Sequence, residues 1–199
     1  MGFRTWLAAV LAVGMVLPAA AAAKEFKVDA AHTTVSFSIR HLFTSMEGRF
    51  DKFEGEIEFD PAHPEKTEVE GSIEVKSINT NNEKRDKHLL SSDFFAAEEH
   101  PLIEFSAAKV TDVSADKKKG KLHGTLKIRG NEKPIVLDVE FLGEGTDPWG
   151  NKKAGFSASG VLDRKQFGLE WNQKLETGGL LVGDEVTIRV QVEGNVDEN

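Results

Sequence analysis

The residues best suited to chemistry lie near the middle of the chain, where Arg85, Asp86 and His88 fall within four positions. An aspartate near a histidine can orient it as a general base, so this group is the candidate for an envelope enzyme acting on a hydrophobic substrate. The chain, however, has no serine in a nucleophile elbow and no glycine-rich phosphate loop. Arg85 and Asp86 could instead hold a segment in place through charge-assisted hydrogen bonds. We therefore expect a structural role for the pair and no catalytic residues.

The six histidines do not form a metal-binding pattern. His32 and His41 are nine positions apart at the two ends of one expected strand, and two others each precede a proline. His88 follows Asp86 by two positions, a spacing that does not bring both onto one helix face. We therefore predict no metal site. A single histidine in an apolar interior could ligate haem iron, an alternative that absorbance near the Soret region would test.

The segment that must carry these side chains is the only one beyond the first 23 residues with a helical pattern. Thr80 and Glu83 have the spacing of a capping box, which predicts a helix start at Thr80. A polar stretch follows and ends in four large apolar residues, Leu89, Leu90, Phe94 and Phe95. We expect a short helical insertion over residues 80–95 whose apolar end either closes one mouth of a barrel or completes the core.

Around this insertion, apolar and polar residues alternate with a period of two, which predicts strands with one buried face. Such strands must bury their apolar faces together as a sandwich or a closed barrel. Closure removes exposed sheet edges, so we predict an all-β fold, an eight-stranded antiparallel β-barrel. The expected strands are residues 34–40, 53–60, 68–76, 103–107, 122–128, 135–141, 156–162 and 186–192.

The inward phase of these strands is apolar, with no inward charge expected. The predicted wall consists of Phe37, Ile39, Phe53, Ile57, Ile73, Phe105, Leu126 and Phe156. Four glycines share this phase, namely Gly55, Gly71, Gly124 and Gly160. They either leave a channel for a chain-like ligand or let the strands bend at barrel corners.

The ends of the interior have a different composition. We expect Leu89, Leu90, Phe94 and Phe95 to line or close one end, with a polar rim of His41, Arg85, Asp86 and His88. Residues 164–183 combine glycines with large apolar residues, including Phe167 and Trp171. Exposed apolar groups on a loop need a partner, so this segment is expected to be a flap over the second mouth or a homodimer contact.

Residues 1–23 have the pattern of a secretory signal peptide: Arg4, an apolar stretch, and alanines up to Ala23. We expect residues 24–199 to form a single domain exported to the periplasm. The formal net charge is −8 without a basic stripe, which argues against nucleic acid and anionic membrane surfaces as partners. The chain has no cysteine, which excludes thiol catalysis, disulfides and cysteine lipidation.

Many residues between positions 29 and 186 also occur in the order that is characteristic of one protein family. They are Asp29, His32, Val35, Phe37, Ile39, His41, Gly48, Phe50 and Phe53; then Thr80, Arg85, Asp86, His88, Leu89, Asp93, Phe94, Phe95, Pro101, Ile103 and Phe105; then Gly124, Thr125, Leu126, Ile128, Arg129, Gly130, Arg164, Phe167, Gly168, Gly183, Asp184 and Val186. The chain thereby resembles the YceI-like family. The resemblance implies a lipocalin-like barrel that binds an isoprenoid or related long-chain lipid in the periplasm.

The expected function is therefore that of a periplasmic carrier that holds a long-chain lipid by passive binding, with no cofactor and only transient membrane contact. Two alternatives remain. One is the envelope enzyme with the Asp86 and His88 region as its site. The other is a stress-response interaction protein whose barrel is packed solid.

Overall fold

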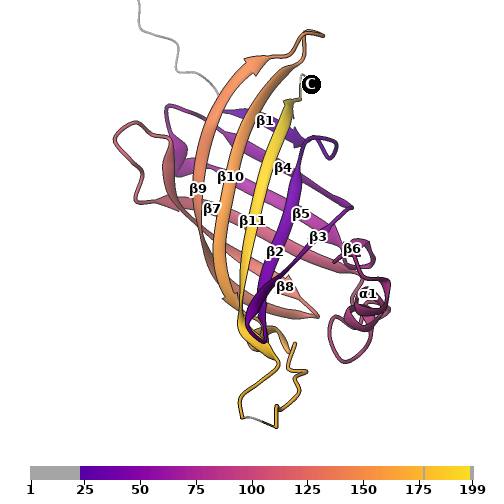
Figure 1. Ribbon diagram of the computed structural model, residues 1–199. Helices are drawn as coiled ribbons and strands as arrows, with labels where there is room; N and C mark the ends of the chain where they lie inside the picture. Colours follow the sequence, from indigo (N-terminus) through magenta and orange to yellow (C-terminus); the bar gives the residue numbers. More distant parts are fainter. Residues whose placement is uncertain (1–22, 177, 198–199) are drawn as a thin grey trace, which may run out of the picture.

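The computed structural model describes residues 23–176 and 178–197, which fold mainly into strands (Figure 1). The predicted signal peptide lies outside the described residues except for its last position, Ala23. In the described part of the chain, no helix has the length and apolar character needed to cross a membrane.

The described strands form one antiparallel sheet in which consecutive strands are mostly neighbours. Their bounds are β1 (Lys24–Val28), β2 (Thr34–His41), β3 (Thr44–Phe50), β4 (Phe53–Phe59), β5 (Glu68–Glu74), β6 (Ile78–Asn79), β7 (Leu102–Thr111), β8 (Lys119–Ile128), β9 (Asn131–Thr146), β10 (Lys152–Asp163) and β11 (Val182–Val196). Three 3₁₀ turns, η1 (Pro64–Lys66), η2 (Val75–Ser77) and η3 (Arg164–Phe167), and one helix, α1 (Glu83–Leu90), complete the described elements.

The sheet closes because β1 pairs with β11 as well as with β4. The closed ring runs β1-β4-β5-β7-β8-β9-β10-β11 and returns to β1. Figure 1 shows these strands curving around a common interior. The predicted eight-stranded antiparallel barrel with a short helical insertion is therefore confirmed.

Three strands of this barrel are interrupted, which the sequence did not predict. Both β1 and β2 pair with β11, so they are two parts of one broken strand. In the same way, β3 pairs with β2 and β4 pairs with β1, so β3 and β4 are two parts of a second broken strand. The third consists of β5 and β6, because β5 pairs with β4 and β6 pairs with β3. The sequence predictions covered β2, β4 and β5 but missed β1, β3 and β6. The missed strand β1 carries Phe26, which is only 1 % exposed and is among the most buried residues.

The apolar face of the sheet forms two groups of buried side chains inside the ring. The larger group lies around α1, β7, β8 and β9 and includes Val75, Phe94 and Phe167. The smaller group, at the other end, is aromatic: Phe59 packs against Phe141 with ring centroids 4.8 Å apart, and edge-on against Phe156 at 5.3 Å. Such aromatic pairs add stability beyond the area they bury.

The helical insertion differs from its predicted form at its start. α1 begins at Glu83, and its N-cap is Asn82, whose side chain accepts a hydrogen bond from the Arg85 amide at 3.1 Å. The capping box predicted from Thr80 and Glu83 is wrong. Thr80 is a buried residue two positions before the N-cap, Asn82. α1 ends at Leu90, so residues 91–95 form turns and no further helix. The insertion lies beside β6 at one end of the barrel, which we call the α1 end (Figure 1).

Candidate ligand-binding cavity

The interior of the barrel contains a cavity of about 890 Å³. This volume lies in the upper part of the range that small-molecule sites occupy. The lining is drawn from most strands of the barrel, from α1 and from the residues that precede β11, and most of it is apolar. A packed barrel would have filled this space with side chains, so the interior is hollow.

Most residues predicted to line the interior do border the cavity. From the strands these are Phe37, Ile39, Phe53, Ile57, Ile73, Phe105, Leu126 and Phe156, and from the α1 end they are Leu89, Phe94, Phe95 and Trp171. Of the predicted polar rim, His41, Arg85 and His88 also border it. The two-residue period placed the strand residues on the inner face, even though the pairing register of β10 shifts between Gly155 and Phe156.

Three predicted residues lie elsewhere. Leu90 packs against the larger core group without bordering the cavity, because successive helical residues point about 100° apart and Leu89 takes the inward position. Phe167, on η3, is buried within the same core group and also does not border the cavity. Asp86 is turned toward Thr80 and is likewise absent from the wall.

The four inward glycines divide into two pairs. Gly55 and Gly71 face each other on β4 and β5 and border the cavity, so they widen it. At Gly124 and Gly160 the space is already taken: an added Cβ would lie 2.6 Å from the Phe105 ring or 2.7 Å from Leu137. The channel interpretation therefore fits only the first pair.

Three rings in mutual contact border the cavity at its α1 end. His88 lies edge-on to Phe94 and to Trp171, with ring centroids 5.1 Å and 5.0 Å away, and Phe94 and Trp171 are 5.2 Å apart. The His88 Nε2 atom lies 2.9 Å from Asp93 Oδ2, within hydrogen-bond distance. This packing joins α1 to the residues that follow η3.

The candidate catalytic group is not assembled in the structure. Asp86 accepts hydrogen bonds from the amide and the hydroxyl of Thr80, whereas His88 is partnered by Asp93. Arg85 donates from Nε to Thr80 Oγ1 and from Nη2 to Thr80 O, each at 2.7 Å. Arg85 and Asp86 thus fix the start of α1 to the residue after β6, a structural role like the one expected from the sequence.

Several charged residues border the cavity, contrary to the expectation of no inward charge, and Arg164 is the buried one among them. The Arg164 side chain is only 3 % exposed, and its burial lowers the pKa of the guanidinium. Its Nε donates to Gly183 O at 2.8 Å, Nη1 donates to Leu169 O, and Nη2 lies 3.5 Å from Asp184 Oδ1. Arg164 therefore joins the residues after η3 to the start of β11.

The contacts of Arg164 change the expectation that all of residues 164–183 form a flap or a dimer contact. Arg164, Phe167 and Leu169 are buried, so the first part of this segment belongs to the core and is not a flap. Beyond Trp171, the chain projects from the α1 end, with Lys174 and Leu180 bridged to each other (Figure 1). A flap or a dimer contact stays a prediction for this outer part alone.

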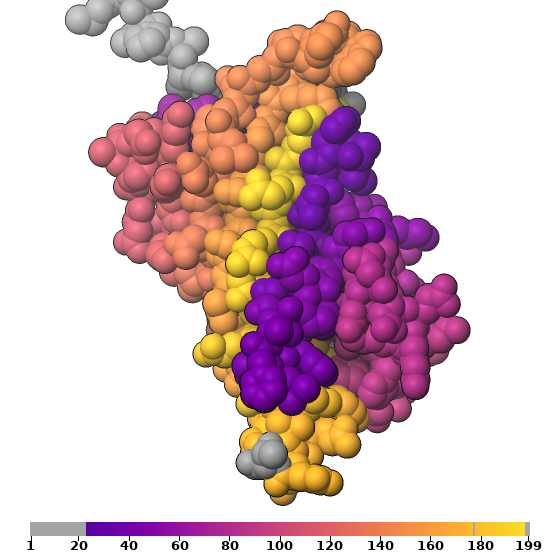
Figure 2. All heavy atoms as spheres, viewed as in Figure 1, coloured from indigo at the N-terminus to yellow at the C-terminus, as the bar shows by residue number. Residues whose placement is uncertain are grey.

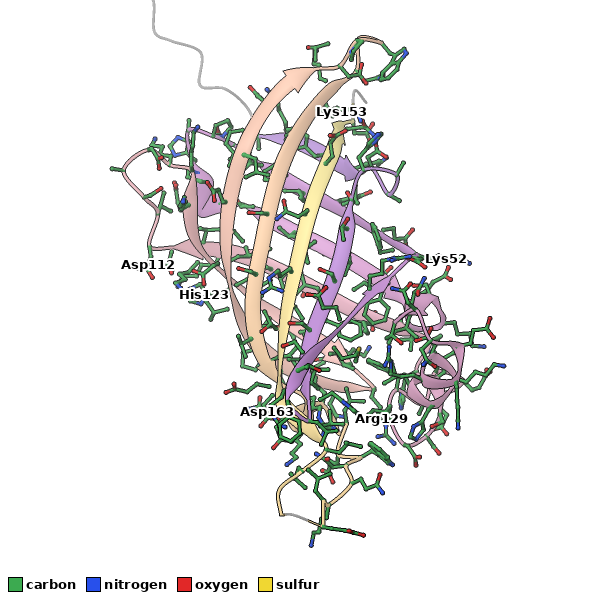
Figure 3. All side chains as sticks on the ribbon, in the orientation of Figure 1. Lys52, Asp112, His123, Arg129, Lys153 and Asp163 are labelled. Atoms are coloured by element: carbon green, nitrogen blue, oxygen red, sulfur yellow. The ribbon has the colours of Figure 1, made fainter. Side chains whose placement is uncertain are left out.

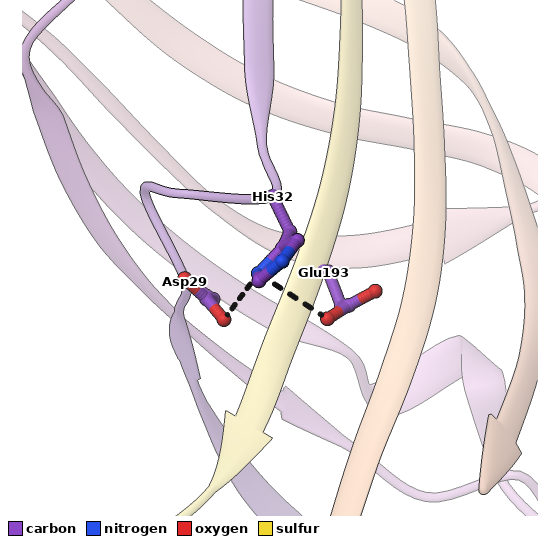
Figure 4. Close-up of side chains that lie close together, drawn as sticks. All are labelled: Asp29, His32 and Glu193. Carbon is purple, nitrogen blue, oxygen red and sulfur yellow. Dashed lines mark hydrogen bonds and ion pairs between the residues drawn. The ribbon is translucent and has the colours of Figure 1, made fainter. Parts of the chain in front are cut away.

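A second polar cluster lies toward the opposite end, where β1 turns into β2 (Figure 4). The His32 Nδ1 atom lies 2.9 Å from Asp29 Oδ2 and 3.7 Å from Glu193 Oε1. These three side chains have the ligand types and proximity of a metal site. The Lys153 ammonium, however, lies 2.8 Å from Asp29 and 2.6 Å from Glu193, so a cationic side chain already pairs with both carboxylates.

The charges in this cluster stabilise each other. Hydrogen bonds from Lys153 and then His32 lower the pKa of Asp29, and the bonds to Asp29 and Glu193 raise the pKa of Lys153. The cluster joins the β1–β2 turn to β10 and β11 and so secures the closure of the barrel. Figure 3 marks Lys153 near this end, and Arg129 and Asp163 near the α1 end. Sequence reasoning missed the cluster because Lys153 and Glu193 are far along the chain from Asp29 and His32.

Comparison with known proteins gave consistent matches. Residues 26–194 match the YceI-like domain. A UPF0312 protein of Vibrio cholerae serotype O1 is 37 % identical over 172 residues, covering 84 % of this chain and 89 % of the relative. The crystal structure of a Campylobacter jejuni YCEI protein is 34 % identical, with a TM-score of 0.68, covering 80 % of this chain and 91 % of that one.

A more distant structure shares the fold. It is described as a polyisoprenoid binding domain from Saccharophagus degradans implicated in plant cell wall breakdown. It is 15 % identical, with a TM-score of 0.61, and the match covers 86 % of this chain and 98 % of that domain.

Proposed function

This chain belongs to the YceI-like family, and from that premise we propose that it binds a long-chain isoprenoid or similar lipid inside its barrel and carries it through the periplasm. The observation that supports this proposal best is the barrel cavity of about 890 Å³ with its largely apolar lining. The Saccharophagus domain of the same fold, described as polyisoprenoid binding, supports the same class of ligand. The signal-peptide pattern of residues 1–23 supports the location.

The energetics of such a site favour a chain over a polar ligand. Burying one methylene group contributes roughly 0.8 kcal/mol, whereas a net hydrogen bond contributes about 0.5–1.5 kcal/mol. A ligand of several isoprene units therefore gains most of its affinity from the apolar wall. Ordering a flexible chain opposes this gain. Because the affinity comes mainly from apolar contact, the cavity should accept related chains of similar length.

Binding rather than catalysis also fits the polar groups that border the cavity. Arg85 and His88 both have protein partners, and Asp86 and His88 are not partners of each other. Family membership and the polyisoprenoid-binding neighbour likewise point to a binding protein.

Native mass spectrometry of the protein purified from the periplasm, followed by organic extraction and lipid analysis, tests this proposal. The expected result is one polyprenyl species per chain. An empty protein that also refuses added long-chain polyprenols would overturn it, and recovery of the protein only from the cytoplasm would overturn its location.

A further inference from the structure

The β2–β3 turn presents the most exposed aromatic residue that the structure describes. Phe43 is 96 % exposed, at the tip of a two-residue turn in which Leu42 has a φ of 52°. Two-residue hairpins usually give a positive φ to glycine, asparagine or aspartate, since a bulky side chain is strained there. Here the strained position holds leucine, and the next residue turns a phenylalanine fully into solvent. Neither Leu42 at a positive φ nor the exposed Phe43 stabilises the isolated barrel.

The turn is held firmly against a second apolar segment. The Leu42 amide donates to Leu181 O at 2.9 Å. Arg40 Nη1 donates to Leu42 O at 3.1 Å and to Leu180 O at 3.5 Å, which ties the two loops together. Figure 2 shows the indigo turn lying directly against the yellow-orange residues at the lower end of the molecule. We call this unit, Leu42–Phe43 with Leu180–Leu181, the apolar tip.

The apolar tip adjoins the cavity. Ile39 and His41, which precede the turn, border the interior, as do Leu181 and Val182 at the start of β11. A second exposed aromatic, Trp149, is 83 % exposed but lies on the β9–β10 hairpin at the opposite end. The tip therefore combines exposed apolar groups with a direct connection to the apolar interior, and Trp149 does not.

We propose that the apolar tip docks on a lipid bilayer, inserts Phe43 among the acyl chains and headgroups, and places the α1 end of the cavity where lipid enters and leaves. This inference rests on the proposed function, because a long-chain isoprenoid resides in a membrane until a carrier takes it up. A protruding turn with one aromatic is suited to the membrane interface, where aromatic side chains are favoured. It is too small for a stable protein interface, which buries about 1,200–2,000 Å².

The charge of the chain determines how this docking should behave. The net charge of −8 opposes attraction to anionic lipid, and Arg40 is engaged by the two loops. Docking should therefore depend on apolar insertion and be insensitive to salt. Vesicles of zwitterionic phosphatidylcholine are the appropriate probe.

The experiment compares wild type, Phe43→Ser and Trp149→Ser in two assays. One measures the rate at which the protein extracts a fluorescent polyprenol from phosphatidylcholine vesicles. The other measures equilibrium affinity for the same polyprenol in detergent. Docking buries the Phe43 ring in the bilayer, so Phe43→Ser should slow extraction about ten- to hundredfold. Phe43→Ser should leave the detergent affinity unchanged, and Trp149→Ser should match wild type in both assays.

The two assays separate this inference from the proposed function. A wild-type protein that binds no polyprenol in detergent would sink the carrier function. Binding in detergent with equal extraction rates for all three proteins, or equal slowing by both variants, would overturn bilayer docking alone. A dimer in sedimentation that Phe43→Ser dissociates would also overturn it and assign the tip to contact between copies of the chain.

Discussion

Gly55 and Gly71 lie directly opposite each other on β4 and β5, and both face the cavity. Only backbone atoms lie within 4 Å of a Cβ added at Gly71, and at Gly55 the nearest side chain is Val28 at 3.4 Å, whereas side chains already fill the space at Gly124 and Gly160. The backbones of the two strands approach closely there: a Cβ added at Gly55 would lie 2.8 Å from Glu70 O, and one added at Gly71 would lie 3.3 Å from Glu54 O.

The two glycines should therefore respond differently to alanine. Gly55→Ala should lower the free energy of unfolding by about 1–3 kcal/mol, since the backbone must shift to relieve the contact. Gly71→Ala should have a smaller effect, because a shift of a few tenths of an ångström suffices. Urea unfolding of both variants measures the difference, and equal losses would contradict the geometry.

Filling the cavity should reduce lipid binding without unfolding the barrel. Ala158 borders the cavity on β10, and its neighbour Ser159 is exposed on the outer face. Ala158→Leu should displace two or three methylene groups of a bound chain and weaken binding about ten- to hundredfold. Ser159→Leu is the matched control and should bind as wild type. Fluorescent polyprenol titration gives both affinities, and unchanged binding by Ala158→Leu would place the ligand elsewhere.

Removing the Thr80 hydroxyl should loosen the start of α1. The side chain is 3 % exposed and lies between Arg85 Nε and Asp86 Oδ1. Thr80→Val keeps the shape but leaves both charged groups short of a hydrogen bond, which should cost about 1–3 kcal/mol of stability. Thr80→Ser retains the hydroxyl and should lose less. Thermal and urea unfolding compare the pair, and the opposite order would show that the methyl group matters more.

The Asp29–Lys153 pair predicts a pH-dependent difference in stability. The pKa of Asp29 is lowered in the folded state, so its contribution is present above the unfolded value of about 3.9 and lost as pH falls below it. The pKa of Lys153 is raised, so its contribution persists until alkaline pH. Asp29→Asn should therefore be less stable than wild type near neutrality, and the two should converge in acid.

Unfolding by urea at a series of pH values between about 3 and 8 measures this difference. Glu132→Gln, which removes an exposed carboxylate on β9, is the control. A gap between wild type and Asp29→Asn that stays constant down to the lowest pH would show that the carboxylate charge is not responsible.

The outer face of β1, β4 and β5 carries like charges opposite one another. Glu58 on β4 pairs in register with Glu25 on β1 and with Glu68 on β5, and all three are exposed. Like charges directly opposite in a sheet are destabilising. Glu58→Lys should therefore raise stability by about 0.2–1 kcal/mol at low salt, and the gain should shrink in about 1 M salt. A gain that does not depend on salt would point to strand propensity instead.

The barrel wall could be predicted from the sequence because inward and outward residues alternate regularly. Phe37, Ile57 and Leu126 were placed correctly by period alone. The breaks within strands were not predictable in this way. β1 is short and is followed by a turn at Asp29, so Phe26 gave no recognisable alternation even though it is nearly completely buried.

The polar part of the site was less predictable because it depends on pairing between distant residues. Arg164 and its partners Gly183 and Asp184 approach only because β10 and β11 are neighbours. In the same way, no local spacing indicates that Lys153 would reach Asp29. The Thr80 capping box was a sound local pattern, but the Thr80 hydroxyl donates to Asp86 and accepts from Arg85, and Asn82 caps the helix instead.

The pairing of β1 with β11 also has a consequence for the order of folding. The strands from β7 to β11 each pair with the next one along the chain and can form successively as local hairpins. The contact of Phe26 with Val196 joins the two ends of the described chain, and a loop that long is entropically costly to close. β1 must therefore wait for β11, which is made much later, and ring closure should be the late, slow step of folding.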